Sequence, residues 1–176
     1  MFKIKRNGLT LIEVLVAVAI IAILSAGLYS VSNYIDMKIK IARTKSTLHI
    51  LVTALERYHE FYGRFPIIDD VNDSADYAKE NYPDAGKKMS SIEKAYYRLS
   101  LAPESKKIIG HIERKMVKDK DKDGFPEVYD VWGTVLMYEY ESGDNFPVVL
   151  SFGPDKVKNS KDDISSKDDD VSSKGL

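Results

Sequence analysis

The chain has 176 residues, of which 44% are hydrophobic and 30% charged, so it carries enough apolar mass for about one folded domain. Its 26 Lys and Arg nearly balance its 27 Asp and Glu, and the net charge of −1 argues against nucleic acid as a partner. The chain has no Cys, which excludes disulfides, thiolate metal sites and Cys nucleophiles. Its three His lack HExxH spacing, and GxSxG and GxxxxGK[ST] motifs are missing, so an enzyme is disfavoured.

An apolar segment near the N-terminus predicts a transmembrane helix. Residues 14–35 carry no formal charge, and these 22 residues are about the length that crosses the hydrocarbon core of a bilayer. Lys3, Lys5 and Arg6 precede the segment with no acidic residue before Glu13, so the positive-inside rule predicts a cytoplasmic N-terminus. A cleaved secretory signal peptide is the alternative, but its apolar region is shorter and ends in a small-residue cleavage site.

Two residues in this region do not suit a plain membrane anchor. Glu13 places a carboxylate inside an otherwise apolar segment, where an ionised group is costly and calls for a cationic partner. Gly8 follows the basic cluster, and residues 3–13 read KIKRNGLTLIE. This string resembles the class III signal of type IV prepilins and type II secretion pseudopilins. In that family a membrane peptidase cleaves after the Gly, here between Gly8 and Leu9, and methylates the new N-terminal residue.

The resemblance implies that residues 1–8 are a leader peptide. Cleavage leaves 168 residues, changes the net charge to −4 and creates an α-ammonium group at Leu9, four residues before Glu13. In the family this ammonium meets the carboxylate of a neighbouring subunit, so Leu9 and Glu13 would set the register of a filament. The simpler alternative is that Glu13 lies near the interface of a membrane anchor that does not assemble.

The helix is predicted to continue as an amphipathic segment over residues 36–66. Gly63 and Pro66 predict its end. Residues 54–66 resemble the pseudopilin passage in which the long helix closes with a Tyr and a Gly-Arg-Tyr-Pro turn. Spacings of three, four and seven place one set of apolar residues on a single helix face, namely Met37, Ile41, Leu48, Leu51, Leu55, Tyr58 and Tyr62.

The predicted globular part, residues 67–164, contains a first acidic cluster. It is preceded by a capping-box pattern at residues 90–93, which predicts a short helix to about residue 101. Asp119, Asp121 and Asp123 then alternate, as the carboxylates of a calcium loop do, and Asp130 takes the twelfth position. Pro126 stands where such loops carry a β-branched residue, and a strand rather than a helix is predicted afterwards. A solvated charged turn is therefore the alternative.

The C-terminal part predicts a β-hairpin, with strands at residues 135–140 and 147–152 and a turn at 142–145. It resembles the major pseudopilin of type II secretion systems, where an Asp-Pro-Trp-Gly entry, a Ser-x-Gly-x-Asp turn and a later Asp-Asp-Ile form a calcium loop. The resemblance implies a calcium ion held by the backbone carbonyl of Phe152 and by three carboxylates, those of Asp155, Asp162 and Asp163.

This loop departs from the family pattern in two ways. Val131 replaces the usual Pro, and Lys156, Lys158 and Lys161 lie in a loop that is normally Gly-rich and oppose a cation. An unstructured acidic tail is the alternative to a calcium site, because residues 165–176 are rich in Ser and Asp and predict disorder.

These patterns predict an α+β, pilin-like fold, in which a long N-terminal helix, transmembrane over residues 9–35, packs on a small antiparallel sheet. The resemblance implies a non-enzymatic pseudopilin of the bacterial inner membrane, with its C-terminal domain in the periplasm. Its partners would be prepilin peptidase, copies of itself, other pseudopilins and the inner-membrane assembly platform. The alternatives are a type IV pilin of a surface fibre and a membrane-anchored, calcium-binding periplasmic protein that does not assemble. The lack of Cys favours the pseudopilin, since pilins often carry a C-terminal disulfide loop.

Overall fold

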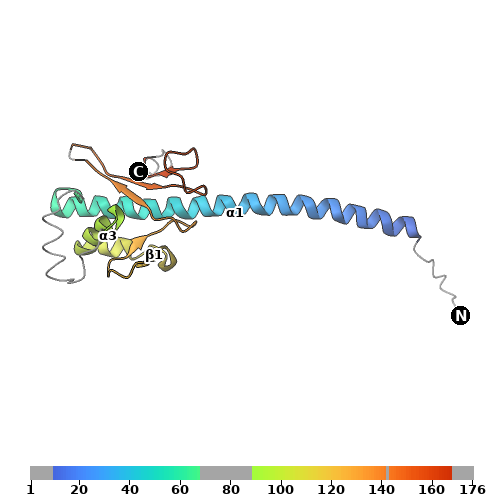
Figure 1. Ribbon diagram of the computed structural model, residues 1–176, viewed down its shortest axis with the longest axis horizontal. Coiled ribbons are helices and arrows are strands. Elements are labelled where there is room, and N and C mark those ends of the chain that lie inside the picture. The colour runs from blue at the N-terminus through green and yellow to red at the C-terminus, as the bar shows by residue number, and fades with distance from the viewer. Residues whose placement is uncertain (1–9, 68–88, 142, 168–176) are drawn as a thin grey trace. The chain divides into compact units, whose positions relative to one another are not determined.

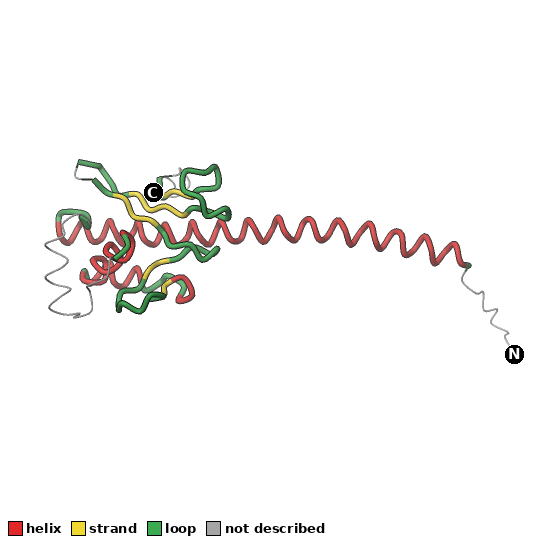
Figure 2. Tube along the Cα trace, viewed as in Figure 1, coloured by secondary structure: helices red, strands yellow, loops and turns green. Residues whose placement is uncertain are grey.

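The computed structural model describes residues 10–67, 89–141 and 143–167, except for the side chains of residues 26–31. The chain divides into two compact units, Met1–Ile39 and Lys40–Leu176. Helix α1 (Leu11–Tyr62) contributes residues to both units, and the other elements belong to the second unit (Figure 1). Loops connect short strands over much of the second unit (Figure 2).

The first unit contains only the N-terminal part of α1 among the described residues. Its large apolar side chains are exposed on every side of the helix, with Leu11 at 85% and Ile23 at 72%. Within the described part of the chain, no helix is long and apolar enough to cross a membrane. The predicted span over residues 9–35 is therefore not confirmed; it includes residue 9 and the side chains of residues 26–31, which lie outside the described residues.

The second unit confirms part of the predicted amphipathic face of α1, because Leu48, Leu51, Leu55 and Tyr58 are buried in the core. Ile41 is partly buried, and Tyr62 is 43% exposed. Met37 belongs to the first unit and is 40% exposed. The helix ends at Tyr62, as predicted, because Gly63 adopts φ +70° and its N–H donates to the carbonyl of His59 at 2.7 Å.

Three short helical elements follow α1. Helix α3 (Ser91–Leu101) begins at the predicted capping box of Ser90 and Glu93. Helix α4 (Pro103–Ile109) and the 3₁₀ turn η1 (Arg114–Met116) are additional to the sequence prediction. The Ser105 hydroxyl at α4 donates to the carbonyl of Ala54 in α1 at 2.7 Å, so α4 is fastened to the long helix by a buried hydrogen bond.

Two small antiparallel sheets complete the unit. Strand β1 (Val117–Lys118) pairs with β2 (Glu127–Val128). Strands β3 (Met137–Glu139), β4 (Val148–Ser151) and β5 (Ile164–Ser165) form the second sheet in the order β3-β4-β5. The pairing of β3 with β4 confirms the predicted hairpin, although residue 142 of its turn lies outside the described residues.

Strand β5 corrects the predicted start of a disordered tail. Ser165 pairs with Leu150, and Ser166 is buried and bonded to Val149 through both its N–H and its hydroxyl oxygen, each at 2.9 Å. Backbone pairing therefore extends into a segment whose Ser and Asp content had indicated disorder. The remainder of the predicted tail, residues 168–176, lies outside the described residues.

A single apolar core joins these elements into an α+β unit, as predicted. Tyr138 of β3 is buried in it, and its hydroxyl donates to the carbonyl of Pro66 at 2.8 Å. Leu136 and Val149 supply the sheet side of the core, and Ile92 and Leu99 supply the side of α3. The pilin-like arrangement of a long helix with small antiparallel sheets is thus present.

Candidate functional site

The predicted processing site, Gly8 and Leu9, lies outside the described residues, which begin at Thr10. Thr10 and Glu13 form a capping box at the start of α1. The N–H and the hydroxyl of Thr10 donate to Glu13 Oε2 at 2.8 and 2.7 Å, and the Glu13 N–H donates to Thr10 Oγ1 at 3.4 Å. Two of the backbone donors that a helix start leaves unpaired are thereby satisfied.

This capping box changes the interpretation of Glu13. The carboxylate has hydrogen-bond partners within its own chain, and a negative charge is favoured at a helix N-terminus. A cation is therefore an addition to these bonds rather than the sole means of satisfying Glu13. The Thr-x-x-Glu spacing of residues 10–13 is the sequence signal of this capping box. Beside Glu13, a shallow apolar groove is lined by Ile12, Val16, Ala17 and Ile20.

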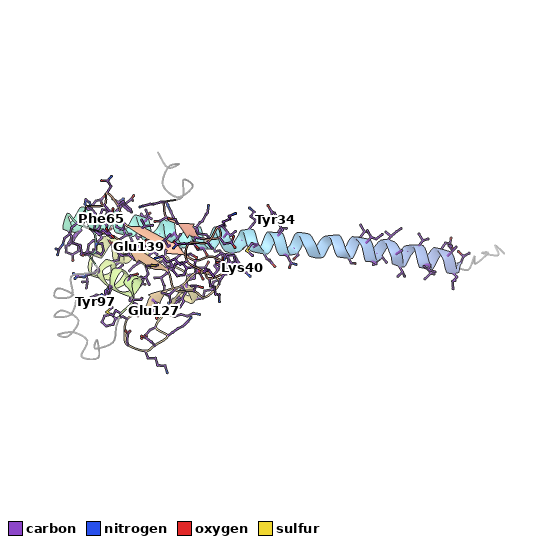
Figure 3. All side chains as sticks on the ribbon, turned by 45° about the horizontal axis from the view of Figure 1, so that its top comes forward. Tyr34, Lys40, Phe65, Tyr97, Glu127 and Glu139 are labelled. Carbon is purple, nitrogen blue, oxygen red and sulfur yellow. The ribbon has the colours of Figure 1, made fainter. Side chains whose placement is uncertain are left out.

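The first acidic cluster is brought together as predicted for three of its four members. One carboxylate oxygen from each of Asp119, Asp121 and Asp123 lies within 4.8 Å of the other two. A second set shares Asp121 and adds Glu93 and Glu127, again with oxygens within 4.8 Å of one another. Glu127 of β2 is labelled in Figure 3, on the same side of the second unit as Tyr97 of α3.

The fourth predicted member, Asp130, serves another purpose. It is 3% exposed, and its Oδ1 accepts from the N–H groups of Trp132 and Thr134 at 2.9 and 2.8 Å. Its Oδ2 accepts from the Ser151 hydroxyl at 2.8 Å. Asp130 therefore departs from the twelve-residue calcium-loop pattern, because a turn rather than a helix follows it and its side chain is directed to Ser151 of β4.

The surroundings of Glu93 shift the pKa of its carboxyl group. Burial raises the pKa of the Glu93 carboxyl, the hydrogen bonds from Ser90 lower it, and the neighbouring charges of Asp123 and Glu127 raise it further. Nearby, burial and the contact with Glu127 raise the pKa of the Tyr129 phenol. The Lys120 ammonium lies 3.7 Å from the centre of the Tyr129 ring, which supplies positive charge at the edge of this region.

The second acidic loop is held by its own backbone. Asp155 Oδ1 accepts from the Val157 N–H at 3.0 Å, and Asp163 Oδ2 accepts from the Asn159 N–H at 2.8 Å. Asp155 and Asp162 are exposed, and Phe152 is partly buried.

The carboxylates of this loop lie apart from the acidic groups described above. Among the described residues, no set of three acidic side chains with oxygens within 4.8 Å of one another includes Asp155, Asp162 or Asp163. Calcium at this loop stays a prediction.

Comparison with protein families adds one finding. The prokaryotic N-terminal methylation motif matches residues 3–29, which include the predicted cleavage site and Glu13. No curated protein and no solved structure matches the chain. The matched segment is the one that resembles the type IV prepilin and pseudopilin signal, and it leads into a long helix followed by a small α+β unit.

Proposed function

We propose that this chain is a pseudopilin, the polymerising subunit of a type II secretion filament that drives folded proteins across the outer membrane. The observation that carries this proposal is the methylation motif at residues 3–29, which includes the start of a helix whose large apolar side chains between residues 11 and 24 are each at least half exposed. The role is mechanical rather than catalytic, and it begins when prepilin peptidase removes residues 1–8.

The exposed apolar surface supports assembly through the N-terminal helix. Leaving one Val, Leu or Ile side chain in water costs about 1.5–3 kcal/mol relative to burying it, so outside the bilayer this surface must pack against other apolar groups. Helices of neighbouring copies can provide these groups in place of lipid. The surface involved consists of residues that are each at least half exposed, namely Leu11, Ile12, Val14, Leu15, Val16, Val18, Ile20, Ile21, Ile23 and Leu24.

Glu13 supports a defined register within that packing. Both Thr10 bonds go to its Oε2, and the carboxylate lies beside the apolar groove of residues 12–20. In the proposed filament the Leu9 α-ammonium of another copy approaches this carboxylate. Removing water strengthens the attraction between the two charges, although part of that gain is offset by the cost of desolvating them.

Intact mass of the membrane-extracted protein tests the processing step. In cells with prepilin peptidase we expect a mature chain that begins at Leu9 with one added methyl group, and in cells without it the unprocessed chain. Gly8→Val should abolish processing, whereas Asn7→Ala serves as the neighbouring control. An unprocessed chain in peptidase-containing cells would contradict the proposal.

Cysteine cross-linking tests the assembly step, and the absence of native Cys makes single substitutions unambiguous. When Leu15→Cys and Val18→Cys chains are made in the same cells, disulfide-linked dimers should form. Lys106→Cys, at an exposed position of α4, should give none. Glu13→Leu should keep membrane association and lose these cross-links. Secretion assays then separate the pseudopilin, which affects exported proteins, from a type IV pilin, which forms a surface fibre. Processing without cross-links would indicate an anchored protein that does not assemble.

A further inference from the structure

The start of α3 contains a buried carboxylate oxygen that has no partner among the described residues. Glu93 is 3% exposed, and its Oε2 accepts a hydrogen bond from the Ser90 N–H in the capping box. Its Oε1 has no hydrogen-bond partner within the described part of the chain. A buried charged oxygen left in this state is costly, which points to a group that the protein itself does not provide.

The loop that follows β1 contains a second oxygen of this kind. Asp123 is 5% exposed; its Oδ1 accepts from the Phe125 N–H at 2.9 Å, while its Oδ2 is buried without a partner in the described residues. Asp119 accepts from the N–H groups of Asp123 and Gly124 at 3.2 and 3.0 Å. Gly124 adopts φ +93°, which permits the sharp turn that brings these carboxylates together.

Packing holds the loop against α3. The ring of Phe125 meets the ring of Tyr97 edge to face, with centroids 5.3 Å apart, and Phe125 is 1% exposed. Lys120 donates its N–H to Glu127 Oε2 at 3.2 Å, which orients the Glu127 carboxylate. The acidic groups therefore face one another because the apolar core fixes the elements that carry them.

We propose that Glu93, Asp119, Asp121, Asp123 and Glu127 bind one Ca²⁺ ion between α3 and the loop before β2. Oxygens bound to one Ca²⁺ at about 2.3–2.6 Å lie no more than about 5.2 Å apart; each of the two sets of three meets that limit separately at 4.8 Å, and Asp121 is common to both sets. Calcium takes six to eight oxygen ligands in flexible geometry, whereas Mg²⁺ demands a smaller octahedron. The ion joins two segments distant in sequence and supplies positive charge to both orphan oxygens. The site does not depend on the proposed secretion role.

Thermal unfolding of the full chain in detergent tests the site. After treatment with EGTA, addition of Ca²⁺ at about 100 times its dissociation constant should raise Tm by about 5–15 °C, and Mg²⁺ should raise it much less. Titration calorimetry should give one Ca²⁺ per chain at this site. The absence of any Ca²⁺-dependent shift would overturn the proposal.

Glu93→Gln separates cation binding from folding. Gln can keep the Ser90 capping bond through its amide oxygen but presents an NH₂ group in place of the second carboxylate oxygen. We expect its Tm in EGTA to equal or exceed that of the unsubstituted chain, and its Ca²⁺-dependent rise to be lost. Asp121→Asn should also lose the rise, while Asp144→Asn on an exposed turn should keep it. Retention of the full rise in both Glu93→Gln and Asp121→Asn, or its loss only in the double variant Asp162→Asn with Asp163→Asn, would refute the site.

Discussion

Asp130 shows how one buried carboxylate can stabilise several segments. It accepts hydrogen bonds from the turn at Trp132 and Thr134 and from Ser151 in β4, so it joins the end of the β1-β2 sheet to the β3-β4-β5 sheet. Removing a buried acceptor leaves its donors without a hydrogen-bond partner, and each such donor costs about 1–3 kcal/mol.

We therefore expect Asp130→Ala to lower the free energy of unfolding by about 2–4 kcal/mol. Asp144→Ala, at an exposed turn, should lower it by no more than about 0.5 kcal/mol. Urea unfolding followed by circular dichroism measures both values. Equal effects of the two substitutions would show that the Asp130 network contributes little.

Gly153 combines two constraints at the entrance to the second acidic loop. Its φ is +65°, and a Cβ at this position would lie 2.1 Å from the carbonyl oxygen of Asp162. Gly63 has a similar φ of +70° but open space around it. We expect Gly63→Ala to cost about 1 kcal/mol through φ alone and Gly153→Ala to cost clearly more. Comparison of their urea midpoints isolates the steric part, which would be absent if the two variants matched.

At the scale of elements, α3 depends on its first turn. The N–H of Glu93 donates to Ser90 Oγ at 3.4 Å, and the Glu93 carboxylate accepts from the Ser90 N–H. Ser90→Ala should lower the free energy of unfolding by about 1 kcal/mol, because a side-chain cap is lost. Ser100→Ala, which removes a local bond to the Tyr97 carbonyl in the same helix, should have a smaller effect. A larger loss at Ser100 would contradict the importance assigned to the cap.

Elements with local signals could be predicted from the sequence, and elements without them could not. The capping residue Ser90 predicts the start of α3, and Gly63, which tolerates a positive φ, predicts the end of α1. Helix α4 was missed because its N-cap is Ala102, which offers no side-chain bond. The two-residue strands β1 and β2 are too short to show alternation.

The same limit applies to the candidate cation site. Alternating Asp residues identified Asp119, Asp121 and Asp123, because these ligands lie within one loop. Glu93 could not be found in this way, since only the packing of α3 on the loop brings it there. Asp130 fits the twelfth loop position by spacing alone, whereas the fold directs its side chain to Ser151 of β4.

At the scale of the whole molecule, buried and partly buried tyrosines link stability to alkaline pH. Burial raises the pKa of four of them above the ordinary value near 10, namely Tyr58, Tyr96, Tyr129 and Tyr138. The unfolded chain releases these protons near pH 10 and the folded chain does not. The stability they contribute is therefore complete below pH 10 and is lost as the pH rises above it.

Absorbance titration of the phenolate band measures this linkage. We expect a group of tyrosines that ionises only together with the loss of near-ultraviolet circular dichroism. Tyr138→Phe also removes the bond to the Pro66 carbonyl and should cost about 1 kcal/mol at neutral pH. Ionisation of all tyrosines in one step near pH 10, with the circular dichroism intact, would contradict the expectation.

The two hydrogen bonds between Ser166 and Val149 have a consequence for biosynthesis. Strand β4 is the middle strand of its sheet, and its second edge is paired by residues 164–166. The ribosome makes these residues after both of the other strands of that sheet. A nascent chain therefore exposes one open edge of β4 until residue 166 has emerged, and chaperones that recognise unpaired strands have that interval in which to act.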